Sequence, residues 1–196
     1  MILDAKSYSE FKKELIASDC SLCGLAAGRT RLVVDRGDPG AKVLFVGEAP
    51  GEKEDLAGKA FVGRSGRLLD EMLREEGFET DRDALIANVV KCRPPDNRRP
   101  SPQEAASCLP FLRKQIELVG PKWIALLGAT AVKHLVPDRE GLPMEDQVGT
   151  FFKHPAYAGI QLIVLYHPAY ILRDPRKRPL MKTHLRRLCD SWREGQ

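Results

Sequence analysis

The 196-residue sequence has no run of about 18 apolar residues, the length that a transmembrane helix requires. Its first residues, 1–6, lack the long apolar segment of a signal peptide. Repeats of domain size and low-complexity segments are also missing. These absences argue against a membrane protein and lead us to expect a cytoplasmic protein whose thiols are reduced.

The composition is that of an ordinary globular chain, with 43% hydrophobic and 30% charged residues. At this length we expect residues 1–196 to form a single domain. The net charge is +4, but residues 173–187 hold seven basic residues and one acidic residue, so the rest of the chain is slightly acidic. Such a concentration suits a polyanion such as nucleic acid, although a solvated helix face explains it equally well.

Apolar runs that alternate with helical patterns predict an α/β fold. The runs predicted to be buried strands are 43–46, 84–90, 123–127 and 160–166. The predicted helices include one that begins at Ser7, with Glu10 in capping-box spacing, and others at 66–76, 101–119 and 180–192. Pro110 predicts a kink or break in the third of these. The pattern indicates a three-layer α/β/α sandwich around a mainly parallel sheet.

A glycine- and proline-rich loop, Gly47-Glu48-Ala49-Pro50-Gly51, follows the first apolar strand. In open parallel sheets, ligands bind at the carboxyl ends of the strands. A carboxylate held there, Glu48, is a candidate for positioning water or stabilising positive charge in a transition state. An ordinary strand-to-helix turn is the competing interpretation.

Four of the five cysteines have a pattern that suggests a shared centre: Cys20 and Cys23 form a C-x2-C pair, and Cys92 and Cys108 follow far along the chain. In a reducing compartment such a pair favours metal ligation over a disulfide. Four thiolates suit Zn²⁺ or an iron–sulfur cluster, although the spacing lacks the second tight pair of a zinc ribbon. Unrelated buried cysteines are the remaining alternative.

The tetrapeptide His-Pro-Ala-Tyr occurs twice, beginning at His154 and at His167. His167 ends the last apolar strand and precedes the basic segment, where a neutral imidazole could stabilise an oxyanion. His154 follows a loop and precedes a turn, so we expect a hairpin or surface residue. After His167, an apolar stretch that includes Tyr170 could wedge into stacked bases, and Arg173 could contact phosphate.

Three segments together resemble one known family, the iron–sulfur uracil-DNA glycosylases of class four. They are GEAPGEKEDLAGKAFVGRSGRLL (47–69), NVVKCRPPDNRRP (88–100) and HPAYILR (167–173), alongside the four-cysteine pattern. The resemblance implies a four-stranded parallel sheet between helices, a [4Fe–4S] cluster on the four cysteines, and removal of uracil from DNA. The cluster would be structural, because hydrolysis requires no redox step.

The resemblance also implies roles for individual residues. Glu48 would lie in the water-positioning loop, Phe61 would stack on a flipped uracil, Asn88 would read the uracil edge, and His167 would stabilise the departing anion. The other expected substrate-binding positions are Gly47, Ala49, Glu54 and Asn97. The expected DNA contacts are Arg93, Arg98, Arg99, Tyr170, Arg173 and Arg176. Ala49 stands where other uracil glycosylases carry an aspartate, so the general base is left unidentified.

Other classes of function remain open on the residues alone. A binder that traps uracil-DNA covalently would carry a nucleophilic histidine between Asn88 and Cys108, and this sequence has none there. A redox protein or a zinc-stabilised DNA-binding module would explain the cysteines but not Phe61, Asn88 and His167 together. We expect uracil-containing DNA as the partner and a monomer as the default state. No segment identifies a sliding-clamp contact.

Overall fold

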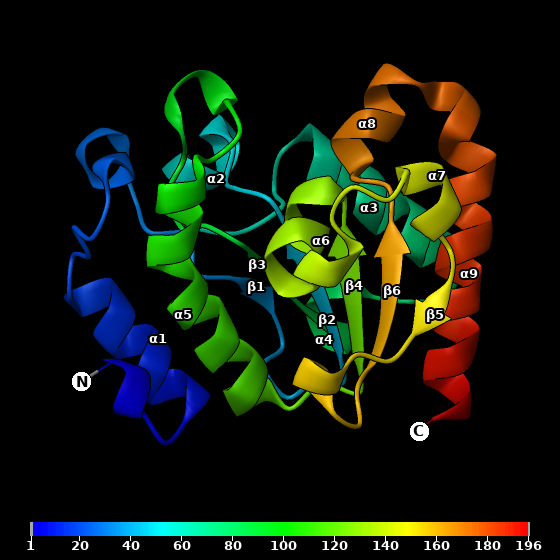
Figure 1. The fold of residues 1–196 in the computed structure, drawn as a ribbon, viewed down its shortest axis with the longest axis horizontal. Helices are drawn as coiled ribbons and strands as arrows, with labels where there is room; N and C mark the ends of the chain where they lie inside the picture. Colours follow the sequence, from blue (N-terminus) through cyan, green and yellow to red (C-terminus); the bar gives the residue numbers. More distant parts are fainter. Residues whose placement is uncertain (1, 196) are drawn as a thin grey trace.

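The computed structural model describes residues 2–195, which form one mixed six-stranded sheet with helices on both faces (Figure 1). The strand order is β1-β3-β2-β4-β6-β5. The strands are β1 (Arg36–Gly37), β2 (Val43–Gly47), β3 (Ala84–Asn88), β4 (Trp123–Leu127), β5 (Phe151–Phe152) and β6 (Gln161–Leu165).

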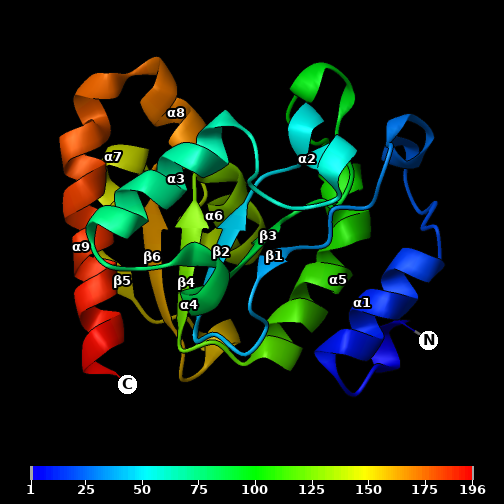
Figure 2. The same cartoon turned by 180° about the vertical axis from the view of Figure 1, so that it is seen from behind.

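The helices separate into layers on either side of this sheet. They are α1 (Tyr8–Ala17), α2 (Glu52–Ala57), α3 (Arg64–Glu75), α4 (Thr80–Asp83), α5 (Pro102–Val119), α6 (Ala129–Leu135), α7 (Met144–Gln147), α8 (Pro168–Arg173) and α9 (Arg178–Glu194). Helix α6 covers one face (Figure 1), and α3 and α4 cover the other, seen from behind in Figure 2. The predicted three-layer arrangement is therefore present.

The four predicted strands form the parallel centre of the sheet, β3-β2-β4-β6. Every residue of β2, β3 and β4 is buried, which explains their uninterrupted apolar sequences. The prediction of a four-stranded sheet is wrong, because β1 and β5 add antiparallel edges on either side. Each edge strand has only two residues, too few to produce an alternating pattern in the sequence.

Local capping signals position the helices. Ser7 and Ser101 each accept a hydrogen bond from the backbone N–H three residues ahead, as their spacing predicts. Helix α5 continues through Pro110, so the predicted break is wrong. Proline deprives the Ala106 carbonyl of its helical donor, but both residues are exposed, and water can bond that carbonyl instead.

The basic segment 173–187 packs against acidic side chains rather than standing free. Arg178 and Lys182 of α9 form ion pairs with Glu75 of α3, and Arg186 pairs with Glu76. Arg176, Lys177 and Arg187 bond Asp174, Glu145 and the Gly149 carbonyl, respectively. Among the described residues, Arg173 is the one basic side chain of this segment without a carboxylate or carbonyl partner. The segment thus fastens α9 to α3. Within residues 2–195, no helix is long and apolar enough to cross a membrane.

Candidate active site

A cavity of about 680 Å³ opens at the carboxyl ends of the four parallel strands. Its walls include residues that end these strands or lie within three residues after them, among them Glu48, Asn88, Thr130 and His167. The strand register brings them together, because Gly47 pairs with Asn88 and Leu127 pairs with Leu165. The sheet edge therefore gathers polar groups from distant parts of the sequence, as the strand-end argument predicts.

Asn88 carries an unsatisfied amide into this cavity. The residue is 1% exposed, and neither Oδ1 nor Nδ2 has a hydrogen-bond partner within the described residues. A buried amide without partners costs free energy, of the order of 1–3 kcal/mol. A ligand with a complementary donor and acceptor would recover that cost.

Phe61 forms the wall next to Asn88. Its backbone has φ +53, a left-handed conformation that is strained for a bulky residue. Two neighbours hold it there: Arg36 donates to the Phe61 carbonyl at 2.6 Å, and Gly66 packs so closely that a Cβ would lie 1.7 Å from the same oxygen. A Cβ on Gly47 would lie 2.6 Å from the Phe61 ring and 2.5 Å from Asn88 Oδ1. Gly47 therefore lies behind both side chains and does not line the cavity.

His167 faces Phe61, with 5.7 Å between the ring centroids. Its Nδ1 accepts a hydrogen bond from the Ala169 N–H at 3.2 Å, so in the neutral ring the proton is on Nε2. Burial, reinforced by the Arg173 charge, lowers the pKa of His167 to about 4. At neutral pH the imidazole is uncharged and offers one N–H donor.

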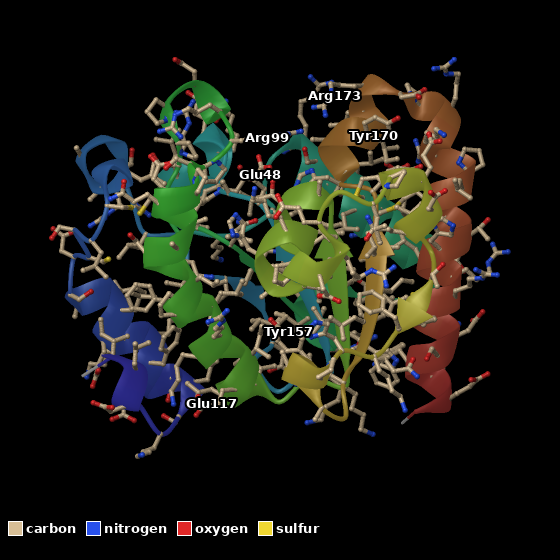
Figure 3. The ribbon with its side chains drawn as sticks, in the orientation of Figure 1. Glu48, Arg99, Glu117, Tyr157, Tyr170 and Arg173 are labelled. Atoms are coloured by element: carbon tan, nitrogen blue, oxygen red, sulfur yellow. The ribbon has the colours of Figure 1, made fainter. Side chains whose placement is uncertain are left out.

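Glu48 and Ala49 form the rim beside β2. The Thr130 hydroxyl, at the start of α6, donates a short hydrogen bond to the Glu48 carboxylate. One Glu48 oxygen is thereby fixed, and the carboxylate keeps acceptor capacity for water. Figure 3 shows Glu48 below Arg99, with Tyr170 and Arg173 to the upper right, and all four residues line the cavity.

Glu54 holds two loops of the site together. Its carboxylate accepts hydrogen bonds from the Gly63 N–H at 2.6 Å and the Gly51 N–H at 3.2 Å. It lines the cavity with Asn97, which is itself bonded to Arg93 at 2.9 Å. Both carboxylate oxygens of Glu54 are thus already used in joining the loop after β2 to the loop before α3.

The predicted DNA-binding residues divide into two sets. Arg98, Arg99, Tyr170 and Arg173 line the cavity, whereas Arg93 and Arg176 do not. Arg98 is held by Glu104 through hydrogen bonds of 2.7 and 2.8 Å, and this guanidinium lowers the pKa of Glu104 to about 2. Arg176 is paired with Asp174. Of the predicted DNA contacts, Arg99 and Arg173 are therefore the cavity-lining cations that no carboxylate within residues 2–195 pairs.

Several polar residues of the cavity were not predicted, among them Arg64, Ser65 and Thr130. Thr130 is the third residue after β4, at the start of α6, so its place near a strand end could have identified it. Arg64 and Ser65 begin α3, two residues before the predicted start of that helix. His154, predicted to lie at the surface, has a side chain 16% exposed and bonds Asp138 outside the cavity.

The four candidate cysteines line a second, smaller cavity between α1, α5 and the loop after β3. Burial raises the pKa of Cys108 to about 11, and the neighbouring thiols add to the rise at Cys92. Within residues 2–195, no three His, Cys, Asp or Glu side chains lie close enough to hold a single metal ion. What the cavity does offer is its donor set, four cysteine side chains, the number that an iron–sulfur cluster or a structural zinc ion takes.

Comparison with known proteins identifies the family of this chain. A model of the Uracil DNA glycosylase superfamily matches residues 34–190. A Type-4 uracil-DNA glycosylase from Thermotoga maritima is 44% identical over 162 residues, which are 79% of each chain. The chain belongs to the type-4 uracil-DNA glycosylase family. Another type-4 member, from Archaeoglobus fulgidus, is 36% identical over 88% of this chain and 87% of its own.

Membership of the type-4 family confirms the resemblance drawn from the three motifs. A Type-5 uracil-DNA glycosylase from Pyrobaculum aerophilum is more distant, at 30% identity over 68% of this chain and 63% of its own. The superfamily match begins after Cys20 and Cys23, so it covers the cavity at the strand ends and only two of the four cysteines.

Proposed function

We propose that this type-4 family member removes uracil from DNA by hydrolysing the bond between the base and its deoxyribose. The observation that carries the proposal is the buried, unpartnered amide of Asn88, which lines one cavity with Phe61 and His167. Uracil presents N3–H and O4 on one edge, which complement an amide oxygen and an amide N–H. Cytosine presents the opposite pattern and would leave the amide unpaired.

The reaction begins with the uridine flipped out of the stack, at a cost of a few kcal/mol. Stacking on Phe61 recovers about 1–3 kcal/mol of it. As the bond between N1 and C1′ breaks, negative charge accumulates on uracil O2, and the N–H at Nε2 of neutral His167 donates to that oxygen. This donation needs no protonated histidine, so it operates at neutral pH.

Water then adds to C1′ and loses a proton, which the uracil anion takes up, so that free uracil and an abasic sugar remain. Glu48 orients that water and offsets the positive charge on the sugar, and Thr130 keeps the carboxylate in place. Arg99 and Arg173 hold the flanking phosphates at the rim. Ala49 supplies no acid–base group, so Glu48 is the carboxylate assigned to the water.

We also propose that Cys20, Cys23, Cys92 and Cys108 hold a [4Fe–4S] cluster. When bound, the cluster would cross-link the segment after α1 to the loop after β3 through their cysteines. Cys92 precedes the loop that carries Arg93, Arg98 and Arg99, so this cross-link would fix the position of the three arginines. We further propose that the chain forms a single domain and that the protein is a cytoplasmic monomer.

The test is uracil release from a labelled oligonucleotide with a single U·G pair and no added metal. The matched control strand carries cytosine in place of uracil. We expect many turnovers on the first strand and none on the second. Binding without release would contradict the enzymatic proposal, and equal release from both strands would contradict the role of Asn88.

A further inference from the structure

Two buried cations, Arg29 and Lys91, line the cavity that holds the four cysteines. The Arg29 side chain is 7% exposed and Lys91 is 1% exposed. Buried charges are rare in proteins unless an opposite charge or a metal site compensates them. Their position next to four thiols therefore requires an explanation beyond packing.

Lys91 has no carboxylate within ion-pair distance among the described residues. Its Nζ donates to the Asn88 carbonyl at 2.7 Å, and its backbone N–H donates to Cys108 Sγ at 3.3 Å. Asp35 lies near enough to influence it, but Lys12 and Tyr8 already occupy the two Asp35 oxygens. An ammonium with a single neutral acceptor is poorly compensated by these residues alone.

Arg29 approaches the cavity from the other side. Its Nη1 donates to the Cys20 carbonyl and lies 3.6 Å from Cys92 Sγ. Its Nη2 pairs with Asp19, whose side chain is 92% exposed. The guanidinium thus joins the loop of the C-x2-C pair to the cysteine that follows β3.

The charge of the expected cofactor matches this pair. In its resting state a [4Fe–4S] core carries two positive charges and its four thiolates carry four negative ones, so two negative charges remain. We propose that Arg29 and Lys91 are the counter-cations of the cluster, and that Lys91 also ties the cluster to the position of Asn88. This inference rests on the cluster proposed above.

The test compares K91M and R29Q with the unaltered holoprotein, purified without air. K12M is the matched control, because Lys12 is a half-exposed partner of Asp35 that does not line the cysteine cavity. The measurements are iron and sulfide per chain, the reduction potential, and the rate of cluster loss in air. Removing a nearby positive charge lowers the potential and eases oxidation, so we expect about tenfold faster loss in both variants.

A second readout separates the two residues. K91M frees the Asn88 carbonyl, so we expect it to lower uracil release and the preference for uracil over cytosine even while its cluster is loaded. R29Q with a loaded cluster should keep that preference. R29K should restore part of the potential, because it restores the charge without the planar fork. If K91M does not fold, the Arg29 pair still tests the role of charge.

Each outcome has one meaning. A wild-type protein with iron and sulfide, together with variants whose potential and cluster lifetime equal those of K12M, would overturn this inference and leave the proposed function intact. Zinc, or no metal, in active wild-type protein would overturn both the cluster and its counter-cations. Lower potentials with faster loss in K91M and R29Q, but not in K12M, would support the inference.

Discussion

The two copies of His-Pro-Ala-Tyr have nearly the same local structure. Each histidine caps a short helix, and in each the Nδ1 accepts from the alanine N–H two residues on, at 3.2 Å. Each ring also has an aromatic neighbour, Tyr157 at 5.8 Å from His154 and Phe61 at 5.7 Å from His167. The tetrapeptide therefore determines the cap and, in the neutral ring, which nitrogen carries the proton.

Their surroundings differ. The Nε2 of His154 is bonded to the Asp138 carboxylate at 2.9 Å, and this side chain lies away from the strand ends. The Nε2 of His167 has no such partner among the described residues, and the ring faces a cavity with Asn88 and Glu48. The sequence of the motif thus sets which ring nitrogen carries the N–H, whereas the position of the motif at the sheet edge leaves that N–H free to bind a ligand.

The largest expected effect is on uracil release after His167→Ala, with His154→Ala as its matched control. Loss of a donor to a developing oxyanion costs about 10²–10³ in rate. We expect that loss for His167→Ala and an unchanged rate for His154→Ala, measured in single turnover with saturating protein. Equal rates in the two variants would remove the functional difference between the copies.

The next largest effect is expected from a change at Asn88, which lines the cavity with His167. Asn88→Asp replaces an amide N–H by an acceptor, so O4 of uracil loses its donor and the amino group of cytosine gains an acceptor. We expect discrimination against cytosine to fall by about ten- to a hundredfold, as for one lost buried hydrogen bond. The measurement is the ratio of release from matched uracil and cytosine strands, and an unchanged ratio would contradict base reading by Asn88.

A third effect is expected in the pH dependence of stability, through His167. His167 has an ordinary pKa of 6.5 when unfolded and about 4 when folded, so the unfolded state binds more protons between these values. Stability from this group is complete above pH 6.5 and is lost as the pH falls toward 4, by about 1.4 kcal/mol per pH unit. Denaturant unfolding at several pH values between 6.5 and 4 should show a shallower slope of stability against pH for His167→Ala than for the wild-type protein.

The smallest effect is expected from Asp138→Asn. This change removes the carboxylate that bonds His154, in a pair whose aspartate is 63% exposed. Such pairs contribute about 0–1 kcal/mol, so we expect a small loss of stability in denaturant unfolding and an unchanged rate of uracil release. A large loss of release would show that the second copy is coupled to the cavity.

Much of the fold was predictable because the central strands are buried on both faces. Their sequences, such as 43–46 and 123–127, consist of uninterrupted apolar residues, and Ser7 and Ser101 mark helix starts by capping chemistry. The two edge strands were not predictable, because pairs such as Phe151–Phe152 become strands only through tertiary pairing. The continuation of α5 through Pro110 depends on solvent exposure, which the sequence does not specify.

For the site, position at strand ends predicted Glu48 and His167, and Asn88, expected from the family resemblance, lines the same cavity. The sequence could not specify which charges remain free. Arg98 and Arg176, both predicted as DNA contacts, are bonded to Glu104 and Asp174 in the structure. The strained backbone of Phe61 was also hidden, because it depends on Gly66 and Arg36 meeting the same carbonyl oxygen.

The packing of the basic segment against α3 affects how the affinity for DNA depends on salt concentration. A free segment with a net charge of +6 would displace many counterions from DNA, at about 0.7–0.9 units of log–log slope for each phosphate neutralised. Here most of those cations are already neutralised within the molecule. The affinity for DNA should therefore depend only weakly on ionic strength. Contacts with the extruded base, rather than with the phosphate backbone, should supply most of the binding free energy.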